Sequence, residues 1–372
     1  MLNRPIAVLG GGNAGYTIAA DIALAGYEVN FYETPQFEGH FKAVLESKSI
    51  EAIDDIGGRR GLAKLHQVTT DMGVAISEVK LILITIPSFG QELFFNAMIP
   101  HLKDGQVVVL MTGNFGSLRL RRILKEKGIV HKITIYETNT MPYGTRLSGP
   151  TTVHIHRGFG PWLGSQSIGE GLHFHGLICA LPAKDTEVAL EDFQKLYPLF
   201  YPAKNVLVVA LNNGNFIMHP VASLLNAGHI EYSKGDFRLH REGHTPSVLR
   251  AEMGVRNEMA ALTKALGGKD FIPETKMEAL FKFSQKRPIE QASVGPRTLK
   301  DRYITEDVPY GLVPMSQLGE KLGIATPLIN AFIEIASVMN EEDYRKTGRT
   351  LESLGLGELD MSQIIKLVEN GE

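Results

Sequence analysis

Cysteine is almost absent from this chain, whose 372 residues contain only Cys179. One cysteine cannot form an intramolecular disulfide, and it cannot supply a cluster of thiolate ligands for a metal. We therefore expect a protein of a reducing compartment, the cytoplasm. The first residues also lack the charged and cleavable apolar segments of a signal peptide, because the apolar residues after Pro5 run directly into three glycines. We expect no signal peptide.

Long apolar runs and a large charge imbalance are missing as well. The longest aliphatic stretches, such as 81–87 and 107–111, are far shorter than the roughly 18 residues of a membrane span, so they predict buried strands. The net charge of −3 gives no general attraction to nucleic acid or to anionic lipid. We expect small molecules as partners, with no nucleic acid and no membrane.

The pattern of apolar residues changes near residue 208. Before it, short β-branched runs alternate with helix-like segments, as in a parallel sheet that is covered on both faces. After Leu211, apolar residues recur at helical spacing, and prolines such as Pro273 and Pro327 mark the ends of the segments. We predict an N-terminal Rossmann-like, doubly wound α/β domain at 1–208, which would bind a dinucleotide, and an all-α substrate domain at 209–372.

The α/β half should consist of repeated βαβ units. The expected strands are 6–10, 28–33, 67–70, 81–86, 106–111, 132–138, 152–156, 174–180 and 206–210. The expected helices include 13–25, 91–102, 116–127 and 186–196.

The first expected strand runs into a Gly-x-Gly-x-x-Gly turn, which an alanine-rich helix and a second strand follow. In this context Gly10 can make the tight turn, Gly12 can let a pyrophosphate approach the backbone, and Gly15 can let the helix pack on the strand. The free N–H groups of the helix N-terminus, at Asn13 and Ala14, would hold the pyrophosphate. The alternative is a purely structural strand–helix junction.

An acidic residue, Glu33, stands at the end of the second strand, where dinucleotide-binding folds place an acid against the adenosine ribose. This acid would repel a 2′-phosphate, so we expect NAD as the cofactor and consider NADP less suited. Pro87 and Ser88 follow the fourth strand and should also border the cofactor, because ligands sit at strand C-termini. An ordinary turn at the end of the strand would look the same.

Two segments of the helical half carry side chains for hydride-transfer chemistry, which needs a proton donor and a cation for a substrate carboxylate. The first contains His219, just before Pro220, and the second contains Arg302 and Asp307. Taken alone, His219 fits a packed histidine at a helix bend. Arg302 and Asp307 alone fit an ion pair on a solvated loop.

Both segments resemble the opine dehydrogenase family, the octopine and nopaline dehydrogenase group. The resemblance rests on Asn-x-x-x-His-Pro at 215–220 and Arg-Tyr-x-x-Glu-Asp at 302–307, and it extends to the glycine-rich turn, 68–71 and 137–146. It implies that His219 is catalytic, that Asp307 is its carboxylate partner and that Arg302 binds the carboxylate of a 2-oxo acid. A histidine titrates near neutral pH, and a carboxylate would fix its tautomer, which agrees with these roles.

Other polar residues have two interpretations. Four histidines on neighbouring strands, at positions 154, 156, 173 and 175, could in principle bind a metal, but alternating polar residues usually mark a solvated strand face. The resemblance implies no metal, and we expect none. Glu137, Thr138, Asn139, Tyr143 and Arg146 either border the substrate or shape a loop.

The resemblance implies an NAD-dependent oxidoreductase that acts on CH–NH groups. It would condense a 2-oxo acid such as pyruvate with the amino group of an amino acid, reversibly, to an N-(1-carboxyalkyl)-amino acid. Two alternatives remain: a 2-oxo acid reductase of the ketopantoate or hydroxyacid type, which usually relies on a lysine, and an NAD-sensing protein without catalysis. The identity of the amino acid, the stereochemistry and the oligomeric state stay open.

Overall fold

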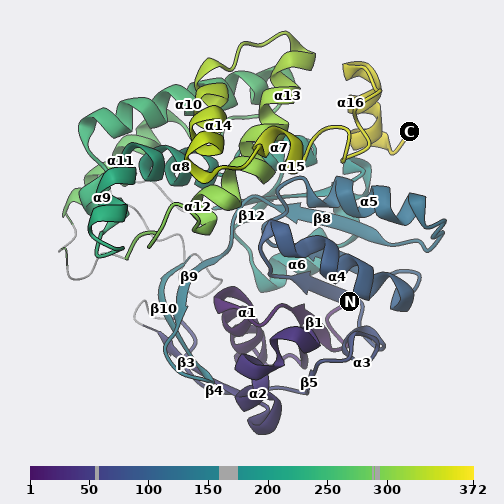
Figure 1. Cartoon of the computed structure of the whole chain (residues 1–372). Coiled ribbons are helices and arrows are strands. Elements are labelled where there is room, and N and C mark those ends of the chain that lie inside the picture. The colour runs from purple at the N-terminus through teal and green to yellow at the C-terminus, as the bar shows by residue number, and fades with distance from the viewer. Residues whose placement is uncertain (55–57, 159–174, 287–288, 290–293) are drawn as a thin grey trace. The chain divides into compact units, whose positions relative to one another are not determined.

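The computed structural model describes residues 1–54, 58–158, 175–286, 289 and 294–372 (Figure 1). Its chain divides into two compact units, each of which is described by itself. Of these residues, unit 1 holds 1–54, 58–158, 175–206 and 369–371. Unit 2 holds 207–286, 289, 294–368 and 372.

Unit 1 is built on an eight-stranded sheet with the order β12-β11-β8-β7-β6-β1-β2-β5. All neighbouring strands are parallel except β11 and β8. The strands are β1 (Ile6–Leu9), β2 (Val29–Tyr32), β5 (Gln67–Thr69), β6 (Leu81–Ile84), β7 (Val107–Leu110), β8 (Thr134–Thr138), β11 (Gly176–Leu181) and β12 (Phe200–Pro202).

Helices cover both faces of this sheet. They are α1 (Asn13–Leu24), α2 (Glu38–Ser47), α3 (Met72–Ile76), α4 (Gln91–Met98), α5 (Gly116–Glu126) and α6 (Leu190–Leu196), with short 3₁₀ turns at Pro35–Phe37, Ser88–Gly90, Ile99–His101 and Ala183–Val188. Ile6 and Val8 of β1 face one hydrophobic core, whereas Ala7 and Leu9 face the other. Successive side chains of a strand point to opposite faces, so an entirely apolar strand supplies both cores. The predicted doubly wound α/β class is confirmed.

A second sheet of four strands, with the order β4-β3-β10-β9, lies beside α1 (Figure 1). Its strands are β3 (Ser49–Asp54), β4 (Gly61–Lys64), β9 (Tyr143–Leu147) and β10 (Thr152–Gly158). The sequence predicted only the strand at 152–156 and placed it in the parallel sheet, which is wrong. β10 pairs with β3 in parallel and with β9 in antiparallel orientation.

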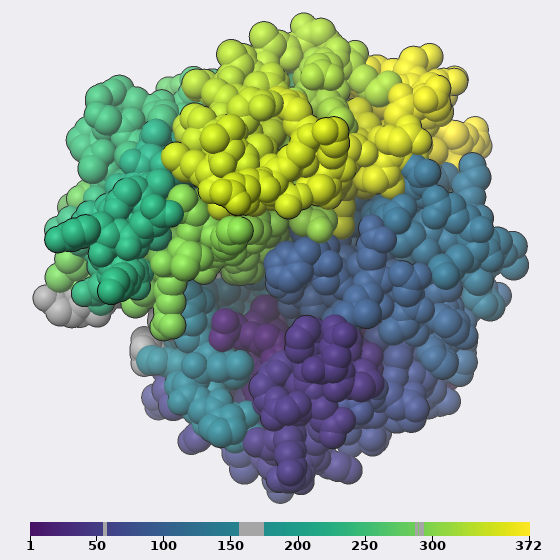
Figure 2. All heavy atoms as spheres, in the orientation of Figure 1, coloured from purple at the N-terminus to yellow at the C-terminus, as the bar shows by residue number. Residues whose placement is uncertain are grey.

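Unit 2 contains helices and turns only, among the residues that the structure describes. They are α7 (Val206–Ala210), α8 (Asn215–Leu225), α9 (Ala227–Tyr232), α10 (Pro246–Ala265), α11 (Glu274–Lys286), α12 (Arg302–Thr305), α13 (Val313–Leu322), α14 (Pro327–Asn340), α15 (Tyr344–Thr347) and α16 (Met361–Asn370), with π-helical turns η5 (Leu239–Gly243) and η7 (Val308–Leu312). The first residue of α7 and the last two of α16 belong to unit 1. In the space-filling view the residues of unit 2 are coloured from teal through green to yellow (Figure 2). None of the described helices is long and apolar enough to cross a bilayer.

One predicted strand is a helix. Residues 206–210 form α7, and the amide of Leu211 continues it by donating to the carbonyl of Leu207 at 2.9 Å. All five residues of α7 are buried. A short run that is apolar at every position shows neither the alternation of a strand nor the 3.6-residue period of a helix. Sequence alone therefore cannot distinguish a buried strand from a buried helix in such a run.

Candidate active site

The glycine-rich turn joins β1 to α1, and steric contacts require glycine at two of its key positions, Gly10 and Gly15. Gly10 has a φ of +115°, and a β-carbon there would collide with the side chain of Ile86. A β-carbon at Gly15 would collide with the carbonyl of Gly10. At Gly12, by contrast, a β-carbon would meet no described atom within 4 Å. The turn is therefore closely packed against the rest of unit 1 at Gly10 and Gly15, whereas space remains beside Gly12.

The open side lies at the N-terminus of α1. Gly12 is the N-cap residue, and no side chain caps the helix there. The side chain of Asn13 points elsewhere, since its Oδ1 accepts a hydrogen bond from the amide of Leu147 in β9 at 2.7 Å. A helix end with uncapped N–H groups attracts an anion. The backbone of Asn13 and Ala14 can supply these donors, as predicted for a pyrophosphate.

The turn after β6 lies beside the glycine-rich turn, because β6 is the neighbour of β1 in the sheet. The hydroxyl of Thr85 donates to the carbonyl of Leu9 at 3.0 Å and joins the two turns. Strand order reverses between β1 and β6, which is the position where open α/β sheets bind ligands. Pro87 and Ser88 follow at this position.

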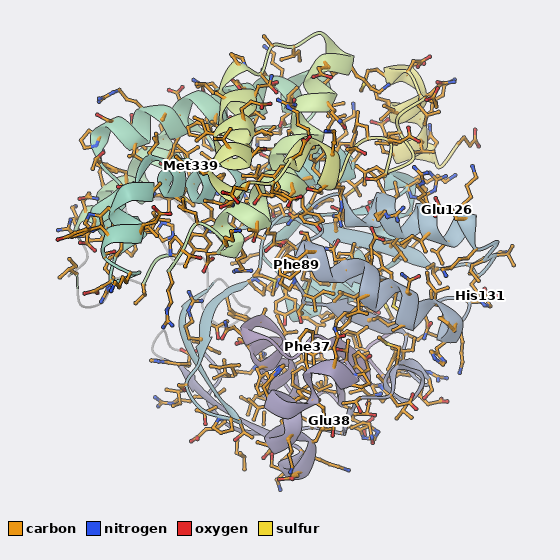
Figure 3. The ribbon with its side chains drawn as sticks, viewed as in Figure 1. Phe37, Glu38, Phe89, Glu126, His131 and Met339 are labelled. Atoms are coloured by element: carbon orange, nitrogen blue, oxygen red, sulfur yellow. The ribbon has the colours of Figure 1, made fainter. Side chains whose placement is uncertain are left out.

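Within that turn, Ser88 is buried and its Oγ accepts a hydrogen bond from Asn114 at 2.9 Å. This hydrogen bond connects the turn after β6 to the loop between β7 and α5. Phe89 beside it is half exposed on the 3₁₀ turn before α4 (Figure 3).

Glu33 lies at the C-terminal end of β2 and is only 5% exposed. Its carboxylate accepts hydrogen bonds from the amides of Gly11 at 2.8 Å and Thr34 at 2.6 Å. His40 Nε2 lies 3.9 Å from it. The carboxylate is thus held next to the open turn, at the position where dinucleotide-binding folds place an acid.

Two half-exposed rings follow Glu33 in the chain, and sequence analysis missed both. They are Phe37, visible in Figure 3, and His40, with ring centroids 6.1 Å apart. Because His40 Nε2 lies 3.9 Å from the Glu33 carboxylate, this ring stands close to the C-terminal end of β2. Their exposure was not readable from a sequence pattern, because they lie on a short turn and the start of a helix.

Glu137 is fully buried and stabilises a loop. Its carboxylate accepts hydrogen bonds from the amides of Phe115 at 3.1 Å and Ser117 at 2.6 Å. Asn114 and Phe115 both have left-handed backbone angles, with φ of 53° and 65°. Such angles are strained for residues other than glycine, and the hydrogen bonds to Glu137 hold the loop in place.

Most of the other residues at 138–146 also shape the fold of unit 1. Asn139 Oδ1 accepts from the amide of Leu177 at 2.7 Å, and the Tyr143 hydroxyl donates to Asp21 at 2.8 Å. Thr138 donates to the carbonyl of Thr140. Arg146 is exposed. Of the histidines considered as metal ligands, His173 and the side chain of His156 lie outside the described residues.

No cluster of potential metal ligands occurs among the residues that the structure describes.

In unit 2 the structure brings His219 and Asp307 together. His219 Nδ1 lies 2.8 Å from Asp307 Oδ2, and both side chains are buried. His219 stands in α8 directly before Pro220, and Asp307 directly precedes η7, while α12 packs against α8. Because Nδ1 faces the carboxylate, the opposite ring nitrogen, Nε2, is the atom through which the imidazole can exchange a proton with a substrate.

Burial raises the pKa of Asp307 to about 8, against the opposing effect of the Arg302 guanidinium. At a contact of 2.8 Å a positive charge on the imidazole and a negative charge on the carboxyl favour one another, so the two side chains form a coupled pair.

Arg302 begins α12, five residues before Asp307. Its side chain is 56% exposed, and Nη1 lies 3.6 Å from Glu306 Oε2. The guanidinium is close enough to Asp307 to act on its pKa. An exposed guanidinium can bind a carboxylate through two parallel hydrogen bonds.

Tyr303 was part of the recognised motif but received no role from the sequence. Its ring lies parallel to the His219 ring, with 3.8 Å between centroids and 3° between planes. His240 of η5 is the third ring at this place, 6.1 Å from His219. The motif itself was the only signal that could have pointed to Tyr303.

Unit 2 thus presents a histidine–carboxylate pair with an exposed guanidinium on the same segment. This arrangement can donate or accept a proton and bind an anionic group. Unit 1 presents an uncapped helix end, an open glycine and a fixed acid, which together fit a dinucleotide.

Comparison with known proteins gives matches over the whole chain. A family model described as the NAD/NADP octopine/nopaline dehydrogenase alpha-helical domain matches residues 202–340. An opine dehydrogenase from Arthrobacter sp. (strain 1C) is 32% identical over 383 residues, which cover 99% of this chain and 99% of that protein.

Solved structures show the same fold. An octopine dehydrogenase structure with NADH and pyruvate superposes with a TM-score of 0.72 at 18% identity and covers 97% of both chains. A yersinopine dehydrogenase structure with bound NADP⁺ superposes with a TM-score of 0.69 at 13% identity and covers 99% of both chains.

Proposed function

Because the chain belongs to the opine dehydrogenase family, we propose that it is an NAD-dependent opine dehydrogenase. It condenses a 2-oxo acid such as pyruvate with the amino group of an amino acid. The carbonyl carbon and the amine form an imine with loss of water, and reduction of the imine gives an N-(1-carboxyalkyl)-amino acid. The reaction is reversible.

The observation that carries this proposal is the 2.8 Å contact between His219 and Asp307, with Arg302 on the same segment. Proton transfer to the oxygen and nitrogen of the condensing substrates needs a group that titrates near neutral pH. A keto acid must also be held by its carboxylate. Two segments of unit 2 that pack against each other, α8 with His219 and α12 with Arg302, meet these requirements.

Each residue then has one task. His219 donates a proton from Nε2 during condensation and reduction, and accepts one in the reverse direction. Asp307 fixes the ring and compensates the charge of the imidazolium. Arg302 binds the oxo acid carboxylate through two hydrogen bonds. NADH, when bound, supplies the hydride for the imine carbon.

The same proposal assigns residues 1–208 to cofactor binding and 209–372 to the amino and oxo acids. Gly10, Gly12, Asn13, Ala14 and Gly15 bind the pyrophosphate through the backbone. Glu33 binds the adenosine ribose, so NAD binds more tightly than NADP, although a relative of the same fold binds NADP⁺. Equal calorimetric affinity for the two cofactors would contradict this role of Glu33.

We also infer that the reaction takes place in the cytoplasm. The proposed substrates are NADH, 2-oxo acids and amino acids, which are pooled there. The single cysteine is buried and unpaired, as expected for a protein of a reducing compartment.

The test is oxidation of NADH by the purified protein with pyruvate and a panel of amino acids. We expect the absorbance of NADH to fall only when both the oxo acid and an amine are present. Oxidation without an amine would indicate a 2-oxo acid reductase. Binding of NADH without oxidation by any combination of 2-oxo acids and amino acids would indicate a sensor.

A further inference from the structure

We propose that Tyr303 is a positioning residue, whose ring keeps the His219 imidazole in the plane that catalysis requires and favours its protonated form. This inference deepens the proposed function and rests on it for the role of His219. Tyr303 does not itself touch a reacting atom in this proposal.

The geometry fixes the histidine from two directions. Asp307 holds the Nδ1 edge of the ring at 2.8 Å, and Tyr303 covers one face at 3.8 Å with only 3° between the planes. A hydrogen bond at one edge still permits the ring to tilt about the bonded nitrogen. A parallel ring in van der Waals contact opposes this tilt and so helps to keep Nε2 in one direction.

The parallel stack also discriminates between the two charge states of the imidazole. The face of an aromatic ring carries negative potential, and a cation over it is attracted by roughly 0.5–2 kcal/mol. A neutral imidazole gains less from the same contact. Tyr303 therefore stabilises the imidazolium relative to the imidazole and makes His219 a weaker acid and a stronger base.

Other charged and titratable groups surround the pair in unit 2. Asp307 contacts the ring directly, and Arg302 and Asp301 act on Asp307. His240 lies 6.1 Å from His219 and 6.4 Å from Tyr303, and the His244 ring is 5.2 Å beyond it. His244 Nε2 is in turn 3.0 Å from Glu252 Oε1 on α10.

These neighbours do not replace the contact with Tyr303. The His240 ring is tilted by 41° to His219. Among the ring contacts that the described residues make with His219, only the one with Tyr303 is parallel.

The test compares Tyr303→Leu with Tyr303→Phe in the full-length enzyme. Leucine removes the aromatic face, whereas phenylalanine keeps the face and removes only the hydroxyl. From the range of cation–π energies, we expect Tyr303→Leu to lower the pKa of His219 by roughly 0.5 to 1.5 pH units. Tyr303→Phe should stay close to the unmodified enzyme.

Two readouts measure the effect. In imine reduction His219 must be protonated, so the alkaline limb of the kcat/KM profile should move to lower pH in Tyr303→Leu. In oxidation of the opine His219 must be neutral, so the acid limb should move the same way. NMR titration of the His219 ring, assigned with His219→Gln, reports the same pKa without turnover.

Tyr310→Leu is the matched control. Tyr310 lies three residues after Asp307, and the Arg349 guanidinium, not His219, stacks on its ring at 4.9 Å. Loss of this ring should leave both limbs of the profile in place. If Tyr303→Leu does not fold, Tyr303→Met retains volume without an aromatic face and serves the same comparison.

The outcomes separate this inference from the proposed function. Unmodified enzyme without amine-dependent NADH oxidation overturns the proposed function, while the NMR titration still tests the stack. Active enzyme whose profile and His219 titration are unchanged in Tyr303→Leu overturns the inference alone. A uniform loss of rate in Tyr303→Phe and Tyr303→Leu, without a shift, would indicate a role of the hydroxyl instead.

Discussion

At the scale of single residues, the Asp307 carboxylate contacts one edge of the His219 imidazole. Burial raises the pKa of Asp307 to about 8, because the ionised carboxylate is poorly solvated in this site. A positive charge on the adjacent imidazole would favour that carboxylate. Protonation of His219 and ionisation of Asp307 therefore favour one another across the 2.8 Å contact.

Removal of either member of this pair should lower the rate. Catalysis by a positioned acid or base is typically worth about 100- to 10,000-fold, and His219→Ala should lose kcat on that scale with NADH affinity unchanged. Asp307→Asn should also lose rate, because the imidazolium then lacks its counter-charge. Residues that act as one unit are not additive, so the double variant should be little slower than His219→Ala.

Steady-state kinetics with both substrates checks this prediction. His229→Ala is the control, since the His229 ring contacts Phe237 in the same unit at 4.7 Å. Near-normal turnover of His219→Ala would return this residue to the role of a packed histidine beside Pro220.

Arg302 allows a prediction about one substrate. Lysine keeps the positive charge but cannot form the two parallel hydrogen bonds of a guanidinium. We expect Arg302→Lys to raise the KM for the oxo acid by about tenfold, the equivalent of about 1.4 kcal/mol, while calorimetric NADH affinity stays constant. An unchanged KM for the oxo acid would assign Arg302 to its surface pair with Glu306.

At the scale of elements, the β1–turn–α1 junction separates a steric from a functional glycine. Gly12→Ala should leave the fold intact, because no described atom lies within 4 Å of the added carbon. The new methyl would occupy the side from which a pyrophosphate approaches, so the affinity for NADH should fall by about tenfold or more. Calorimetry and the melting temperature measure the two effects.

Gly15→Ala is the matched variant, because its β-carbon would collide with the Gly10 carbonyl. This variant should lose stability as well as cofactor binding. If Gly12→Ala bound NADH normally, the pyrophosphate would have to lie elsewhere.

The elements that the sequence predicted well are those with a local physical signal. The strands β1 and β2 and the helix α1 end within about one residue of the prediction, because apolar runs and special glycines define their boundaries. The strands β3, β4 and β9 were missed. They are short and partly solvated, with Leu62 exposed in β4. The pairing of β3 with β10 also joins residues about 100 apart, which no local pattern records.

The candidate site likewise contains residues that the sequence predicts and contacts that it does not. His219, Arg302 and Asp307 could be found because a family motif carries them, and the structure places His219 and Asp307 in contact. The parallel stack of Tyr303 could not be found, because it depends on the relative orientation of two rings from segments 84 residues apart. The same holds for Glu137, whose partners are amides of another loop.

At the scale of the whole molecule, both units bury carboxyl groups whose pKa is raised. Asp307 is an example in unit 2, and in unit 1 burial raises the pKa of Asp21 of α1 to about 7. Asp21 accepts hydrogen bonds from the Tyr143 hydroxyl at 2.8 Å and from Arg59 at 2.9 Å, and both oppose the effect of burial on its pKa. Asp21 links α1 to the second sheet through Tyr143.

This raised pKa predicts how stability depends on pH. The ordinary pKa of Asp21 is 3.8, so between about pH 4 and 7 the folded protein keeps a proton on this group that the unfolded chain has lost. Its contribution to the free energy of unfolding is therefore complete below pH 4 and is lost as the pH rises through 7. The slope reaches at most about 1.4 kcal/mol per pH unit.

Asp21→Asn removes this titration while retaining an oxygen that can accept from Tyr143. We expect the difference in free energy of unfolding, unmodified protein minus variant, to fall steadily from pH 4.5 to pH 7, as measured by urea unfolding followed by circular dichroism.

Asp360→Asn is the control, because the pKa of Asp360 is shifted in the opposite direction. Asp360 is exposed, and hydrogen bonds from the Gln363 amide and Ser362 lower its pKa, so its contribution is lost only as the pH falls below about 4. A difference for Asp21→Asn that stays flat over this range would show that the carboxyl is already ionised in the folded protein and pairs with Arg59 throughout.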